Sequence, residues 1–184
     1  MTGEGLRRDQ VINLLNDLER RLTERGTVLD IQIVGGAALL LHGLIDRATE
    51  DIDARYQHST AVDEVAAQMA KEYGLPDKWL NSHAAAFLPE NVQWMVPPTG
   101  SFSAVRLADL PSLAAMKVAA EREKDIIDLG YLVNALGIED PEELVDLAYE
   151  MYGEDSMPLS QGRLNYEIVA DEAIAVARRL KNGK

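Results

Sequence analysis

The stretch "IVGGAALLLHGLIDRATEDIDARY", residues 33–56, places a glycine pair at the end of an apolar segment and two aspartates about fifteen positions later. Residues 28–34 alternate as a strand does, and the residues after the glycines are apolar enough for a short buried helix. Residues 50–56 alternate again and predict a second strand. One interpretation is that the glycines form a tight turn and the aspartates lie on a solvated strand edge. The other is that the glycine segment and the aspartate segment face one another across a nucleotide and its metal ions.

The two aspartates, Asp51 and Asp53, would project from one face of the second strand, because side chains alternate along a strand. Two neighbouring carboxylates repel each other unless a cation lies between them, and Mg²⁺ prefers oxygen ligands. The pair therefore predicts a Mg²⁺ site.

The glycine pair, Gly35 and Gly36, would lie where a turn enters a helix. Backbone N–H groups converge there with the positive end of the helix dipole, and glycine lets a triphosphate approach closely. The combination predicts nucleotidyl transfer from a nucleoside triphosphate (NTP), in which the metal neutralises developing charge and lowers the pKa of the attacking hydroxyl.

This order of elements resembles the nucleotidyltransferase superfamily with the polymerase-β-like fold, and most closely the small bacterial group that includes the AbiEii-type toxins of type IV toxin–antitoxin systems. The matching residues are Gly35, Gly36, His42, Gly43, Arg47, Thr49, Asp51 and Asp53. The resemblance implies that Asp51 and Asp53 are catalytic metal ligands, with an NTP as substrate, a tRNA as acceptor and an antitoxin as partner. Nucleotide binding would involve Gly35, Gly36, Arg47 and Thr49.

A second, looser match is "KVAAEREKDIIDL", residues 117–129. The resemblance implies that Lys117 and Asp128 are catalytic and that Arg122 binds the nucleotide, with Asp125 as the remaining motif position. A continuous buried helix is predicted over 112–137. On such a helix Lys117, Glu121, Lys124 and Asp128 share one face, which either meets a ligand or forms solvated i,i+4 pairs.

A third carboxylate, which enzymes of this superfamily often carry on a later strand, is not evident. The strand candidates 91–96 and 101–108 contain no acid, and Asp109 is predicted to cap the helix that follows. The AbiEii-like group tolerates this loss. The absence also leaves open a catalytically inactive module that binds a nucleotide or a partner.

Isolated histidines and tryptophans of the chain are predicted to be structural. His42 is expected to be satisfied within the fold, with ligand contact as the alternative. Trp79 and Trp94 are expected to pack in the fold, and lining a base pocket is the alternative for either of them.

The predicted fold class is α+β: a small mixed sheet flanked by helices over residues 1–110, then a helical region over 111–184. Further helices are expected at 6–25, 59–74, 141–153 and 164–181. The length of 184 residues favours a single domain.

The charge balance of 18 Lys+Arg against 31 Asp+Glu gives −13, which disfavours general DNA binding. Local recognition of an RNA end remains open, as does a cationic acceptor of the kind used by antibiotic (aminoglycoside-like) nucleotidyltransferases. The chain has no cysteine and no apolar run long enough to span a membrane. These features predict a cytoplasmic protein without a membrane partner.

Overall fold

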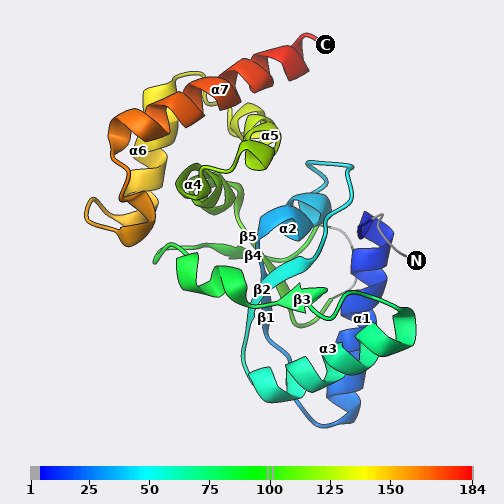
Figure 1. The fold of residues 1–184 in the computed structure, drawn as a ribbon. Coiled ribbons are helices and arrows are strands. Elements are labelled where there is room, and N and C mark those ends of the chain that lie inside the picture. The colour runs from blue at the N-terminus through cyan, green and yellow to red at the C-terminus, as the bar shows by residue number, and fades with distance from the viewer. Residues whose placement is uncertain (1–4, 99, 101, 184) are drawn as a thin grey trace. The chain divides into compact units, whose positions relative to one another are not determined.

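The computed structural model describes residues 5–98, 100 and 102–183 (Figure 1). The chain divides into two compact units. The first comprises the chain up to Ala86 together with Trp94–Ala108, and the second comprises Phe87–Gln93 together with the chain from Asp109 onward. That both units act as a single domain stays a prediction.

The first unit is built on a five-stranded mixed sheet with the strand order β3-β2-β1-β5-β4. Strand β1 is antiparallel to β2 and parallel to β5, whereas β3 is parallel to β2 and β4 is antiparallel to β5. Its elements are α1 (Arg8–Glu24), β1 (Ile31–Ile33), α2 (Gly35–His42), β2 (Ile52–Tyr56), α3 (Ser59–Tyr73), β3 (Leu80–Asn81), β4 (Trp94–Met95) and β5 (Val105–Ala108). A 3₁₀ helix, η1 (His83–Phe87), follows β3.

One face of this sheet is apolar and belongs to the core. Its side chains are fully buried, and they are Ile31, Ile33, Ile52, Ala54, Val105 and Leu107. Helices α1 and α3 lie side by side and also bury apolar stripes (Figure 1). The opposite face carries the polar residues that alternate with this set, and the alternation follows from the period of a strand.

The predicted elements of the first unit are confirmed, but β3 was not predicted. The strands expected at 91–96 and 101–108 span only Trp94–Met95 and Val105–Ala108, and residue 101 lies outside the described residues. The first strand is shorter than 28–34 and spans Ile31–Ile33. The glycine pair does not form a turn before the helix; Gly35 and Gly36 are the first two residues of α2, and the extended Val34 precedes them. Gly35 makes this abrupt transition from strand to helix with a φ of +66°, which favours glycine.

The second unit is helical in its described part. It contains α4 (Leu110–Ala120), η2 (Glu123–Asp125), α5 (Ile126–Leu136), α6 (Pro141–Tyr152), η3 (Met157–Leu159) and α7 (Arg163–Lys181). Helix α5 packs on α7, and α4 packs on α6 (Figure 1). Gly130 in α5 leaves no room for a Cβ atom beside Val176 of α7, so the two helices approach closely. The mixed sheet and these helices confirm the α+β fold class.

The predicted continuous helix over 112–137 is wrong. Helix α4 ends at Ala120, Glu121 adopts a left-handed conformation with φ +50°, and α5 begins only at Ile126. The run of charged residues 121–125 marks the break, because such side chains cannot all be buried along an apolar helix. The predicted shared face of Lys117, Glu121, Lys124 and Asp128 therefore does not form.

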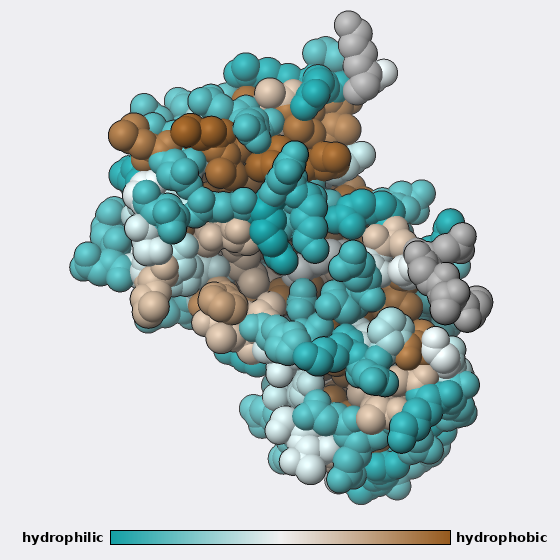
Figure 2. Space-filling model, in the orientation of Figure 1, coloured by the Kyte–Doolittle hydropathy of each residue, from teal (hydrophilic) through white to brown (hydrophobic). Residues whose placement is uncertain are grey.

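The surface of the second unit exposes several large apolar side chains. Figure 2 shows an apolar area over α5 and α7, the helices that carry the exposed Ile127, Leu164 and Ile168. None of the described helices has the length and apolar character required to cross a membrane.

Candidate functional site

The glycine pair and the second strand face one another in the first unit. A methyl group built on Gly35 would lie 3.0 Å from Oδ2 of Asp53, and one built on Gly36 would lie 2.7 Å from Oγ1 of Thr49. Side chains of this chain therefore fill the space beside both glycines, which is a reason for glycine besides the approach of a phosphate. The start of α2 and the aspartate segment are therefore adjacent, and together they form the candidate site.

Asp51 directly precedes β2, and Asp53 is the second residue of this strand. Ile52 between them is fully buried in the core, whereas Asp51 and Asp53 are half-buried on the other face. Oδ2 of Asp51 accepts a hydrogen bond of 3.0 Å from Nδ2 of Asn81. Asp51 makes no ion pair with any described residue, so its charge is compensated by an amide dipole and not by a cation.

Asn81 is a member of the site that the sequence analysis missed. It lies on β3, in register with Asp53 of β2, and its side chain is buried. Its Oδ1 accepts a bond of 3.1 Å from the backbone N–H of His83. That donor fixes the orientation of the amide, so its NH₂ group must face Asp51. The two-residue strand lies in a segment without a clear period, and no sequence signal singled it out.

The absence of a third acid on the two later strands agrees with the structure, since neither β4 nor β5 contains one. Asp109 caps α4, because its Oδ1 accepts a bond of 3.2 Å from the N–H of Ser112. The predicted N-cap is confirmed. The strand beside the aspartates instead contributes the neutral Asn81.

Two carboxylates fit a Mg²⁺ ion that completes its shell with water and substrate phosphates, since Mg²⁺ usually takes one or two protein carboxylates at such sites. The described residues hold no group of three or more acidic or histidine side chains placed for a metal. Asp51 and Asp53 are therefore the residues that would hold the ion, and they would need the phosphates of a nucleotide as further ligands.

The loop before β2 contributes Thr49 and Arg47. The hydroxyl of Thr49 donates a bond of 3.2 Å to the backbone carbonyl of Asp51 and is buried against Gly36. Nη1 of Arg47 donates to the carbonyl of Ala48 at 3.3 Å, and the side chain is exposed. The structure thus gives Thr49 a part in shaping the loop, and it leaves Arg47 at the surface.

The histidine of the motif is held within the fold. Nε2 of His42 lies 2.8 Å from the backbone carbonyl of Ala108, which ties the end of α2 to the end of β5. The structural interpretation of His42 is confirmed by this bond. Trp79 is also structural, because it is fully buried and its Nε1 donates to the carbonyl of Ala66 at 3.0 Å.

The second motif forms a buried ionic cluster in the second unit. Nζ of Lys117 lies 2.6 Å from Oδ1 of Asp125 and 3.0 Å from Oδ2 of Asp128. In a continuous helix Asp125 would be about 12 Å further along the axis than Lys117, so the break between α4 and α5 brings them together. The structure unites all four predicted motif residues, because Nε of Arg122 also lies 2.8 Å from Oδ2 of Asp125.

The pKa of Asp125 reflects this cluster. Burial acts to raise the pKa, but the charges and hydrogen bonds of Lys117 and Arg122 outweigh it and hold the pKa below the usual 3.8. The cluster is close to neutral, with two cations facing two carboxylates.

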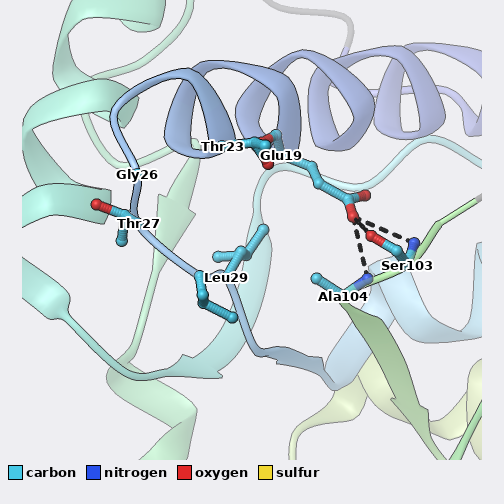
Figure 3. Close-up of a pocket in the computed structure, with 8 residues that line it drawn as sticks. Glu19, Thr23, Gly26, Thr27, Leu29, Ser103 and Ala104 are labelled. Carbon is cyan, nitrogen blue, oxygen red and sulfur yellow. Dashed lines mark hydrogen bonds between the residues drawn. The ribbon is translucent and has the colours of Figure 1, made fainter.

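A pocket of about 290 Å³ lies in the first unit beside the start of β5 (Figure 3). Glu19 of α1 lines it, and its Oε1 accepts bonds from the N–H groups of Ser103 at 3.2 Å and Ala104 at 3.1 Å and from the Ser103 hydroxyl (Figure 3). The pocket lies where β1 and β5 begin, whereas the glycines follow the end of β1. It is separate from the aspartate site, and its acid is engaged in holding the strand.

Comparison with known proteins gives one match. A family model described as a nucleotidyltransferase of unknown function matches residues 9–158. No curated protein and no solved structure matches the chain significantly. The matched region contains the glycine pair, both aspartates and the Lys117 cluster. It supports the nucleotidyltransferase superfamily, while membership of the AbiEii-type subgroup stays a prediction.

Proposed function

The chain belongs to this family of nucleotidyltransferases, and we propose that it transfers a nucleotidyl group from a Mg²⁺-bound NTP to an acceptor, for which we favour a tRNA end. The observation that carries the proposal is the apposition of the start of α2 with Asp53 and Thr49, on the segment that also holds Asp51. We propose that oxygen ligands for the metal and N–H groups for the phosphates meet there.

This geometry supports the donor half of the proposed reaction, which is the binding of the NTP and its metal. The first N–H groups of α2 have no partner within the helix and carry its positive dipole end, so they suit the phosphates of an NTP. Asp51 and Asp53 would hold the Mg²⁺, which supplies charge neutralisation at the phosphates and a more acidic acceptor hydroxyl. The buried Asn81 would keep Asp51 oriented toward the metal.

The role of the second motif is part of the same proposal. The resemblance assigns Lys117 and Asp128 to catalysis and Arg122 to the nucleotide. The contacts of Lys117 with two buried carboxylates support a fixed position for its ammonium group. Because these bonds also join α4 to α5, we propose that the cluster maintains the bend between them as well.

Calorimetry tests the site assignment. We expect NTP to bind only with Mg²⁺ and the variant Asp51→Ala/Asp53→Ala to lose this binding. The matching Asp51→Asn/Asp53→Asn variant keeps the side-chain size and separates loss of charge from loss of fold. Unchanged binding in both variants would refute the assignment.

The acceptor is tested by labelling. The protein is incubated with labelled NTPs and either total tRNA or aminoglycosides, and we expect label on tRNA. The alternative, an antibiotic nucleotidyltransferase, is favoured by the net charge of −13, which suits a cationic acceptor. Label on the aminoglycoside would establish that alternative, and bound NTP without label on either acceptor would indicate an inactive module.

A toxin-like role, with an antitoxin as partner, is the last part of the proposal. The exposed apolar side chains of α7, Leu164 and Ile168, support a protein partner. Expression of the protein in a bacterial host is expected to arrest growth, and the Asp51→Asn/Asp53→Asn variant is expected to be harmless. Normal growth with the unmodified protein at equal abundance would refute the toxin-like role.

A further inference from the structure

The polar face of the sheet carries a row of long side chains next to the two aspartates. Gln32 of β1 is in register with Arg55 of β2 and with Arg106 of β5. Asp53 lies two residues before Arg55 on the same strand and therefore on the same face. Any substrate held at the aspartates would lie beside this row.

Arg55 joins three strands across this face. Its Nε donates a bond of 2.7 Å to Oε1 of Gln32, and its guanidinium carbon lies 5.3 Å from the centroid of the Trp94 ring on β4. Arg55 is exposed and Trp94 is half-buried. The bond to Gln32 holds the guanidinium against the ring, so the pair forms a preorganised flat surface.

The surroundings of the Arg55 charge distinguish this arginine from the others that lie on aromatic rings. Arg55 makes no ion pair with the residues that the structure describes, although the chain contains 31 Asp+Glu. A second arginine–aromatic pair of the first unit differs in this respect. Arg21 lies 5.7 Å from the Tyr73 ring, but Asp17 and Glu72 each contact its guanidinium at 2.8 Å. The positive charge of Arg55 is therefore available to a phosphate, whereas two carboxylates already compensate the charge of Arg21.

We propose that Trp94, Arg55 and Gln32 form a platform that stacks a nucleobase and contacts its phosphate. The platform rests on the proposed function, because it extends the aspartate site. Aromatic rings and guanidinium planes stack on bases of any identity, and the guanidinium also attracts phosphate. An aminoglycoside acceptor has no aromatic base that could stack on this platform. Because it is cationic, the positive charges of Arg55 and Arg106 would also repel it.

The base can come from two sources, the NTP itself or the end of an acceptor RNA, and tryptophan fluorescence distinguishes them. The chain has two tryptophans, and Trp79 is fully buried, so Trp94 is the one that a ligand can reach. The full-length protein is titrated in one arm with each NTP and Mg²⁺, and in the other with a short single-stranded RNA alone. Quenching in the first arm assigns the platform to the donor base, and quenching in the second assigns it to the acceptor.

Three variants make the test specific. Trp94→Phe should abolish the quenching yet keep the calorimetric affinity close to that of the unmodified protein, because an aromatic face remains. Trp94→Ala should weaken binding by roughly five- to hundredfold. Tyr73→Ala removes the aromatic ring beside Arg21, whose charge is compensated by two carboxylates. This control variant should leave ligand binding unchanged.

The outcomes separate the platform from the proposed function. Mg²⁺-dependent NTP binding with unchanged Trp94 fluorescence in both arms, and with full affinity in Trp94→Ala, would overturn the platform alone. Quenching that persists in Asp51→Ala/Asp53→Ala would support the platform and count against the metal site. Quenching by an aminoglycoside but by neither nucleotide ligand would overturn the platform.

Discussion

The protein contains two pairs of aspartates at short spacing, and their surroundings differ. Asp51 and Asp53 are half-buried at the start of β2, where the neighbours are an amide, a hydroxyl and the glycine pair. Asp125 and Asp128 are buried at the start of α5, where Lys117 contacts both. An amide dipole thus faces Asp51 in the first unit, whereas a cation faces both Asp125 and Asp128 in the second.

The difference indicates which pair can bind a metal. Taking a carboxylate out of water is unfavourable unless a cation or several hydrogen bonds compensate it. Lys117 and Arg122 supply that compensation in the second unit, so Asp125 and Asp128 are less suited to bind a metal. Among the residues described, the amide dipole of Asn81 is what faces the Asp51 carboxylate, and an external cation would complete its compensation.

The largest effect is expected when the internal cation is removed. Lys117→Met leaves two buried carboxylates without their shared partner and should lower the free energy of unfolding by about 3–5 kcal/mol. Urea unfolding followed by circular dichroism measures it. Lys181→Met is the matched control, because Lys181 pairs with Glu139 at the exposed surface and should hardly change stability. Equal stability of both variants would contradict the buried-cluster interpretation.

The next largest loss of stability is expected when a third negative charge is placed beside Asp51 and Asp53. Asn81→Asp keeps an acceptor for the N–H of His83 but replaces the donor to Asp51 with a like charge. Without metal, the free energy of unfolding should fall by about 1.5–3 kcal/mol, the usual value for a hydrogen bond to a charged group.

Metal should reverse this loss, because the site would then contain three carboxylates. Thermal unfolding with and without Mn²⁺ or Mg²⁺ measures the reversal. Asn16→Asp adds the same charge on the exposed side of α1 and should show no metal dependence. A metal response no larger than that of the control would show that Asn81 does not face the ion.

Smaller effects are expected at the glycine that faces Asp53. Gly35→Ala should lower the free energy of unfolding by about 1–2 kcal/mol, because its φ of +66° is unfavourable for alanine. Gly74→Ala is a close control, with a φ of +65° and no atom within 4 Å of the added methyl group. Gly35→Ala should lose at least as much stability as Gly74→Ala, because its methyl group would lie 3.0 Å from Oδ2 of Asp53, and only Gly35→Ala should weaken Mg²⁺-dependent NTP binding. Equal binding in the two would remove Gly35 from the site.

The smallest expected effect is a pH dependence of the free energy of unfolding. The pKa of Asp125 in the folded protein lies below the usual 3.8, so the ionised group stabilises the fold above that pH. This contribution is lost as the pH falls from about 4 through the folded pKa. The stability gap between the unmodified protein and Lys117→Met should therefore narrow below about pH 4, as measured by urea unfolding at several pH values. A gap that stays constant down to the acid transition would contradict this coupling.

The sequence predicted local features well where a short-range pattern was sufficient. The apolar period of α1, the alternation of β2 and β5 and the cap at Asp109 are all confirmed. Helices α6 and α7 also lie where their apolar periods predicted them. These features depend on side chains a few residues apart, and such neighbours are visible in the chain order.

The errors and omissions depend on contacts between distant residues. The break after Ala120 was missed, because a regular helix was assumed to place Lys117 beside Glu121 and not beside Asp125. Asn81 was missed because its importance comes from Asp51, thirty residues earlier on a neighbouring strand. For Trp94 the sequence left packing and a base pocket open, and it could not show that Arg55 lies against the ring.

The sequence alone determined that this protein has an α+β fold, that it resembles the nucleotidyltransferases and that a glycine pair precedes two aspartates. Only the tertiary structure decided that Gly35 lies against Asp53, that Asn81 orients Asp51 and that Lys117 neutralises the other acidic pair. The physical reason is that the range of a hydrogen bond or ion pair is a few ångströms. Which groups come within that range is set by strand register and helix breaks, which depend on the folded chain as a whole.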